Sequence, residues 1–100
     1  MAEYVAVRRD VVEELLKWLC EKAATNRMVA QTYERIYGCS LEELEARIQR
    51  EGVPPDEEGH AMWEASIEWG IVAKELEELE KFIQELRSAL NRPVALPPGL

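Results

Sequence analysis

The stretch YGCSLEELEARI, residues 37–48, ends one helix and begins another within three residues. Gly38 is the residue type that most often follows the last turn of a helix, because glycine adopts the left-handed conformation without steric cost. Ser40 and Glu43 have the spacing of a capping box, in which each side chain binds an unpaired backbone N–H group of the new helix. The sequence therefore predicts a sharp corner between two helices at residues 38–40.

Before this corner, residues 10–37 have the apolar spacing of one face of a helix, with Asp10 as a candidate N-cap. Steps of four and three residues define the stripe, which consists of Val12, Leu16, Leu19, Ala23, Asn26, Ala30, Tyr33 and Tyr37. Asn26 is its one polar member. Four more apolar residues make the stripe wider than a coiled-coil seam: Val11, Leu15, Val29 and Ile36. This width indicates a helix packed in a bundle.

After the corner, a short helix is expected over residues 41–51, with Leu41, Leu44 and Ile48 on one face and Gly52 at its end. The sequence VPPD then forms an extended turn. A second long helix is expected over residues 57–91, and its apolar stripe consists of Met62, Ala65, Trp69, Val72, Leu76, Leu79, Ile83, Leu86 and Leu90. Gly70, inside this helix, predicts a close helix crossing.

The predicted fold class is all-α, with a long, a short and a long helix in an antiparallel hairpin or bundle. Residues 1–92 form a single helical domain, and residues 93–100 form a Pro-rich extended tail. Because the short helix covers little of either long stripe, we expect a homo-oligomer to complete the bundle.

Two alternatives depend on whether the first helix is continuous through Thr25 and Asn26. A break there, with a strand at residues 4–7, would give the element order of a ribbon-helix-helix DNA-binding regulator, although the turn lacks the usual glycine. A break would also allow a disulfide between Cys20 and Cys39. In a continuous helix these residues lie about 28 Å apart, beyond the ~7 Å Cα limit for a bridge, and both thiols are free.

The charge of the chain is acidic and uneven. The formal net charge is −8, with 8 basic and 9 acidic residues in positions 1–50 and 4 and 11 in positions 51–100. Such a surface repels nucleic acid and membrane phosphates and attracts basic proteins. The chain has no apolar run of membrane length, so we expect a cytoplasmic protein. Many Glu and Arg residues with only two Asn suggest a thermophile.

The sequence offers no catalytic constellation. His60 is the one histidine, and with Glu57 it supplies half of a di-metal carboxylate motif. The helix order is similar to that of helical chorismate mutases, but neither apolar stripe contains the basic residues that those enzymes need. MazG-like pyrophosphohydrolases need a Glu-x-x-Asp motif, in which a glutamate stands three residues before an aspartate. Here the residues three positions before Asp10 and Asp56 are Val7 and Val53, so the motif is missing. We therefore predict a non-enzymatic protein without catalytic, cofactor-binding or metal-binding residues.

The segments YERIYGCSLEELEARI and MWEASIEWGIVAKELEEL resemble small prokaryotic antitoxin-like helical proteins, over about residues 28–90. The resemblance implies a protein-binding module that neutralises a basic partner such as a ribonuclease. The alternative is a self-associating, coiled-coil-like scaffold or adaptor, which the uninterrupted heptads favour. The predicted partner-binding residues are an aromatic anchor and three acidic neighbours: Trp63, Glu64, Glu68 and Glu75.

Overall fold

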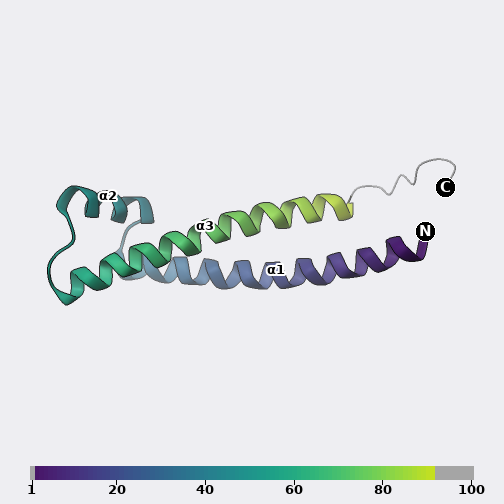
Figure 1. Ribbon diagram of the computed structural model, residues 1–100, viewed down its shortest axis with the longest axis horizontal. Helices are drawn as coiled ribbons and strands as arrows, with labels where there is room; N and C mark the ends of the chain where they lie inside the picture. The colour runs from purple at the N-terminus through teal and green to yellow at the C-terminus, as the bar shows by residue number, and fades with distance from the viewer. Residues whose placement is uncertain (1, 92–100) are drawn as a thin grey trace.

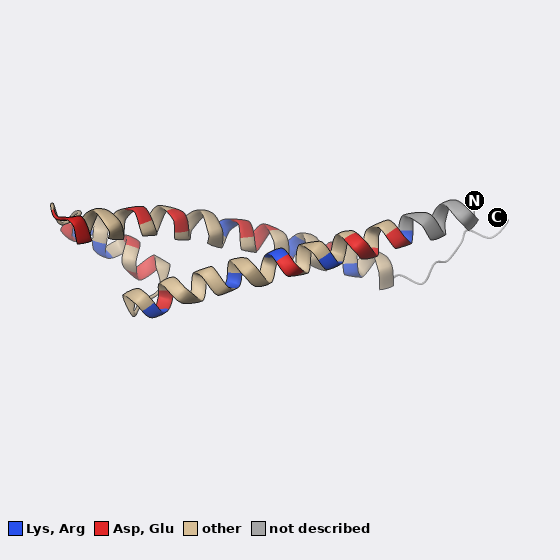
Figure 2. Ribbon diagram, turned by 90° about the horizontal axis from the view of Figure 1, so that it is seen from below, with Lys and Arg blue, Asp and Glu red and all other residues tan. Residues whose placement is uncertain are grey.

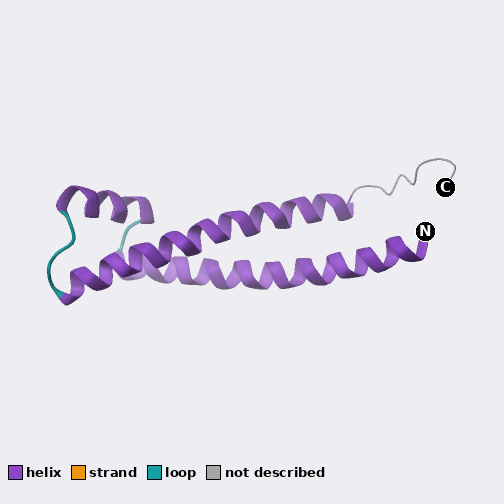
Figure 3. Ribbon diagram, viewed as in Figure 1, coloured by secondary structure: helices purple, strands orange, loops and turns teal. Residues whose placement is uncertain are grey.

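The computed structural model describes the backbone of residues 2–91 and the side chains of residues 9–91. It contains three helices, α1 (Ala2–Tyr37), α2 (Leu41–Glu51) and α3 (Glu57–Asn91). Figure 3 shows that these described residues form helices and loops without a strand. The predicted order of long, short and long helix is confirmed, whereas the Pro-rich tail expected at residues 93–100 lies outside the described residues.

The two long helices form an antiparallel hairpin, as predicted (Figure 1). Contacts between them pair rising residue numbers in α1 with falling numbers in α3: Cys20 with Arg87, Arg27 with Glu80, and Tyr33 with Glu68. The molecule is elongated, with extents of 69 × 20 × 17 Å and a radius of gyration of 20.4 Å. A compact domain of this length has a radius of gyration of about 13 Å. Most of the hairpin is therefore only two helices thick.

Helix α1 is longer and more regular than the sequence predicts. It begins at Ala2 rather than at Asp10, so residues 4–7 are helical and the strand alternative is wrong. The helix also continues through Thr25, whose Oγ1 donates to the carbonyl oxygen of Glu21 at 3.1 Å, a bond typical of a threonine inside a helix. The arrangement of a ribbon-helix-helix unit is therefore absent from the described residues, and both cysteines are free.

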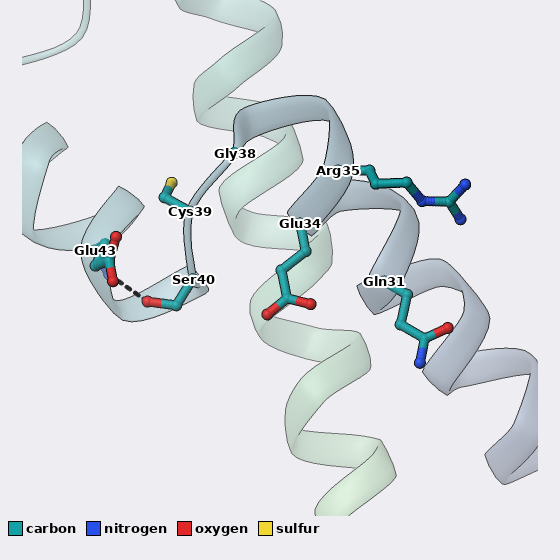
Figure 4. Close-up of a pocket in the computed structure, with 7 residues that line it drawn as sticks. All are labelled: Gln31, Glu34, Arg35, Gly38, Cys39, Ser40 and Glu43. Carbon is teal, nitrogen blue, oxygen red and sulfur yellow. Dashed lines mark hydrogen bonds between the residues drawn. The ribbon is translucent and has the colours of Figure 1, made fainter.

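The corner between α1 and α2 has the predicted glycine and serine geometry. Gly38 has a φ of 66°, and its N–H donates to Glu34 O at 2.8 Å. Ser40 is extended, and its Oγ accepts from Glu43 N at 3.2 Å (Figure 4). The reciprocal bond of a capping box, from Ser40 N to the Glu43 carboxylate, is not among the hydrogen bonds of residues 9–91. One half of the predicted capping box is thus formed.

The corner between α2 and α3 is fixed by a second glycine and an aspartate. Gly52 ends α2 with a φ of 78°, and its N–H donates to Ile48 O at 2.8 Å. Asp56 caps α3 by accepting from Gly59 N at 2.7 Å. Gly59 is buried against Pro54, and a methyl group added to it would overlap the Pro54 carbonyl oxygen. This contact holds the VPPD segment against the first turn of α3.

The core is a single row of side chains between α1 and α3. Leu19, Ala23, Leu79 and Ile83 are buried at its centre. Every position of the two predicted 3,4 stripes is buried or half-buried, so these stripes are confirmed. Of the residues expected to widen the α1 stripe, Val29 is half-buried, whereas Val11, Leu15 and Ile36 are exposed. Asn26, the polar member, donates from Nδ2 to Val72 O at 3.4 Å. This bond satisfies the polar group inside the helix interface.

Helix α2 covers only one end of the hairpin. Its Leu44 is fully buried, and Figure 1 shows α2 beside the first half of α3. Gly70 lies near this contact but has no atom within 4 Å of the position of an added Cβ. The predicted close helix crossing at Gly70 is therefore wrong. Within residues 2–91, no third helix covers the remaining length of the hairpin.

Candidate protein-binding surface

One edge of the hairpin exposes a line of large apolar side chains. On α1, Val11, Leu15 and Trp18 follow one another at steps of four and three residues and so share one stripe. Eighteen residues after Trp18, which is five turns of helix, Ile36 returns to the same stripe. On α3, Ile71 and Phe82 lie on one stripe with Glu75 and Glu78 between them.

These two stripes meet along the same side of the core. Lys22 Nζ of the α1 stripe lies 3.3 Å from Glu75 Oε1 of the α3 stripe and 5.3 Å from the centroid of the Trp18 ring. A hollow of about 290 Å³ lies between the two helices at this edge. It is lined by Trp18, Lys22, Glu75, Glu78, Leu79 and Phe82. We call this edge the open seam and define its apolar residues as Val11, Leu15, Trp18, Ile36, Ile71 and Phe82.

Among the side chains of residues 9–91, ten large apolar ones are exposed, and the open seam holds six of them. Their exposed fractions run from 37% for Leu15 to 63% for Ile36. Single exposed apolar residues are common on soluble proteins, but several of them along one edge favour an interaction surface.

The opposite edge is polar and partly covered. Arg27 Nη2 binds Glu80 Oε1 at 2.9 Å, and Arg87 Nη2 donates to Cys20 Sγ at 3.6 Å. At one end of this edge, α2 approaches Ser66 and Gly70 of α3, which line a hollow with Glu45. The same hollow is lined by Ile71, so α2 borders the open seam at Ile71 and lies away from the rest of it. The two edges of the hairpin thus differ in chemistry.

Three of the four predicted partner-binding residues lie on the α3 stripe of the open seam, and Trp63 lies beside that stripe. Trp63 is 43% exposed and stacks on His60 at 6.1 Å between ring centroids. Glu64, Glu68 and Glu75 share a stripe of α3 that lies about 100° from Trp63 around the helix. Each of the three carboxylates has a contact: Glu64 with His60 Nε2 at 3.0 Å, Glu68 with the Tyr33 hydroxyl, and Glu75 with Lys22.

The contact between Tyr33 and Glu68 ties the two long helices together beside the open seam. The Tyr33 hydroxyl donates to Glu68 Oε2 at 2.6 Å, and its ring stacks on Trp69 at 5.8 Å. This hydrogen bond to a carboxylate, together with burial, raises the pKa of Tyr33 to about 12. Ionisation would remove the donated proton and place two negative charges side by side.

Trp18 and Phe82, which the sequence prediction did not select, are the aromatic residues of the open seam. Trp18 continues the spacing of Val11 and Leu15, which were recognised only as a widening of the α1 stripe. Continuing the spacing of Val11 and Leu15 by three residues identifies Trp18 from the sequence. Phe82 is harder than Trp18 to identify from the sequence, because the charged residues Glu75 and Glu78 stand between it and Ile71 on the same stripe.

The hollow at the corner and the acidic residues of α3 are weaker candidates for a binding site. The hollow at the corner is lined by Gln31, Glu34, Arg35, Gly38, Cys39, Ser40 and Glu43. Figure 4 shows the Arg35 guanidinium pointing away from the loop with Cys39 and Ser40, so charged groups do not converge there. Acidic residues occur along the whole of α3, and basic residues stand between them only in its second half (Figure 2).

Within the described residues, no group of three or more His, Cys, Asp or Glu residues is placed to hold a metal ion. None of the helices of the described residues is long and apolar enough to cross a membrane. Comparison of the chain with protein-family models, with curated proteins and with solved structures gives no match.

Proposed function

We propose that this protein is a non-catalytic helical module that binds another protein surface through the open seam. The observation that supports this proposal is the alignment of six exposed apolar side chains along one edge of the hairpin. Covering them would remove apolar area from water, which is the main favourable term in protein association. The elongated, two-helix shape presents this edge along most of its length.

The aromatic pair at the hollow is the expected centre of binding. Trp18 is 55% exposed and Phe82 is 43% exposed, and both line the same hollow. Aromatic residues in the middle of an interface often account for most of the binding free energy. Lys22 and Glu75 beside them supply polar contacts that can fix the orientation of a partner.

The proposal is tested by measuring the size of the assembly that contains this chain in extracts of its native host. We expect the tagged wild-type chain to elute as a complex larger than one chain, and Trp18→Gln/Phe82→Gln to elute as a single chain. The matched control is Met28→Gln/Val53→Gln, which changes exposed apolar residues outside the open seam. A wild-type chain that elutes alone, or a complex that the seam variant leaves intact, would contradict the proposal.

A basic partner, as for an antitoxin that neutralises a ribonuclease, is a second candidate, favoured by the acidic charge of residues 51–100. Reversing Glu68 or Glu75 would also break their contacts with α1. The cleaner test is therefore Glu77→Lys/Glu85→Lys, since neither glutamate has an ion-pair partner among residues 9–91. If this candidate is correct, the variant slows association with the product of the adjacent gene, most clearly at low salt.

A further inference from the structure

We infer that the partner of the open seam is a second copy of this chain, related to the first by a two-fold axis that passes near Lys22 and Glu75. The inference rests on the proposed function and names the occupant of the same surface. The two hairpins then form a four-helix bundle in which each open seam covers the other.

The apolar area of the seam matches what a dimer needs when both sides contribute it. A specific interface buries at least about 600 Å² on each partner. The six apolar side chains of the open seam, each roughly half exposed, together offer on the order of 600 Å² at about 100 Å² each. A second copy supplies an equal apolar area, so the pair reaches the lower limit for a stable interface.

The shape of the seam also fits a second hairpin. From Val11 to Ile36 the seam runs about 37 Å along α1, at 1.5 Å per residue. The α3 side of the seam runs antiparallel to it, and the two helices are gently curved and cross each other (Figure 1). A surface of the same length and shape is present on every copy of the chain. Antiparallel packing of two such pairs is the usual geometry of a four-helix bundle.

The charges at the middle of the seam favour a two-fold arrangement. Lys22, Glu75 and Glu78 all line the central hollow. Lys22 binds Glu75, whereas Glu78 has no ion-pair partner among residues 9–91. A two-fold axis at this point places Lys22 of one copy beside Lys22 of the other, with Glu75 and Glu78 of both copies around them. Four carboxylates then surround the two lysines, so opposite charges lie side by side at the axis.

The apolar residues are distributed on both sides of this centre. Toward the start of α1 lie Val11, Leu15 and Trp18, with Phe82 of α3 beside them. Ile36 and Ile71 lie toward the corner. A two-fold axis exchanges the two ends of the seam, so Phe82 of one copy lies near Ile71 of the other, and Val11 lies near Ile36. The interface is therefore self-complementary, as a two-fold dimer requires.

Sedimentation equilibrium of the purified chain tests the inference. We expect the wild-type protein to have twice the mass of one 11.5 kDa chain at micromolar concentration. Trp18→Gln/Phe82→Gln should raise the dissociation constant by roughly 100-fold or more, because two aromatic residues are lost from each copy. The control Met28→Gln/Val53→Gln should leave the dimer unchanged. If the double variant loses its helical circular dichroism, Phe82→Ala replaces it, with an expected increase of about tenfold.

A wild-type monomer, or a dimer that the seam variants do not weaken, would overturn the inference. A different result decides whether the proposed function is wrong. If the chain is a monomer in isolation but its complex in host extracts still depends on Trp18 and Phe82, then the seam binds a different protein. In that case the inference is wrong and the proposed function stands.

Discussion

At the residue scale, two glycines of α3 illustrate what a sequence does not reveal. Gly59 and Gly70 both interrupt a run of helix-forming residues, and the sequence suggests a tight contact only at Gly70. The structure places the tight contact at Gly59, where Pro54 packs on the helix, and leaves open space at Gly70. The contact at Gly59 depends on the path of the VPPD segment, which local spacing does not determine.

We predict opposite effects for alanine at these two positions. Gly59→Ala would place Cβ 2.7 Å from Pro54 Cβ and against the Pro54 carbonyl, and should destabilise the fold by about 1–3 kcal/mol. Gly70→Ala meets no atom and should stabilise it by up to about 1 kcal/mol through helix propensity. Urea unfolding at one fixed protein concentration measures both. Equal effects at the two sites would show that Pro54 does not pack on Gly59.

A second residue-scale prediction concerns the pKa of Tyr33. Replacing Glu68 with Gln removes the negative charge beside the hydroxyl and should lower this pKa from about 12 toward the ordinary value of 10.0. Phenolate absorbance during a pH titration reports the change, and Tyr33→Phe identifies the signal. The control Glu64→Gln lies on the same stripe but contacts His60, and it should leave the pKa of Tyr33 unchanged.

The same shift sets a pH dependence of stability. Because the pKa of Tyr33 is higher in the folded chain than in the unfolded chain, its contribution to stability is complete below pH 10. That contribution is lost as the pH rises from about 10 to 12. The wild-type protein should therefore lose more stability over this range than Tyr33→Phe does. If the stability of the two proteins falls equally between pH 10 and 12, the Tyr33 hydroxyl does not bind Glu68 as described.

At the element scale, the helices were the most predictable part of this protein. The steps of four and three residues located both long stripes, and Gly38, Ser40 and Gly52 located the ends of the helices. Predictions failed where few residues carried the signal. Residues 4–7 fit a strand or a helix equally well, and the continuation of α1 through them depends on the whole helix rather than on those four residues. Thr25 could cap a helix, but it bonds within one.

The corner between α1 and α2 allows a direct test of capping. Ser40→Ala removes the side chain that accepts from Glu43 N and should cost about 1 kcal/mol, within a range of 0.5–2 kcal/mol. Ser66→Ala is the matched control, because Ser66 bonds to the carbonyl of Trp63 inside α3 and should cost little or nothing. Thermal unfolding compares the two variants. If Ser66→Ala is the more destabilising change, capping by Ser40 is unimportant.

At the scale of the whole molecule, the candidate surface was only partly predictable. The sequence indicated that the apolar stripes exceed what one short helix can cover, and it assigned partner binding to Trp63, Glu64, Glu68 and Glu75. The structure shows that Glu68 and Glu75 bind α1 side chains and that the apolar line runs through Trp18 and Phe82. Which side of a wide stripe stays exposed depends on where α2 packs, and helical spacing alone does not specify this.

The thin core of the chain gives self-association a physical reason. Only seven apolar side chains of residues 9–91 are buried: Leu19, Ala23, Leu44, Ala65, Trp69, Leu79 and Ile83. Small domains with so few buried residues usually need a metal, a disulfide or oligomerisation for stability. The two cysteines are free, and the described residues include no cluster suited to a metal ion. A second hairpin on the open seam would enlarge the core without any of these cross-links.

The most direct test of this account is chemical cross-linking at the proposed two-fold axis. In a Cys20→Ser/Cys39→Ser background, Lys22→Cys places one thiol at the centre of the open seam, and Gln84→Cys places one on the opposite edge, beside Arg27 and Arg87. With a short bifunctional thiol reagent at micromolar protein concentration, we expect Lys22→Cys to give a covalent dimer and Gln84→Cys to remain a single chain. Efficient cross-linking at Gln84→Cys without any at Lys22→Cys would contradict the docking of a second copy on the open seam.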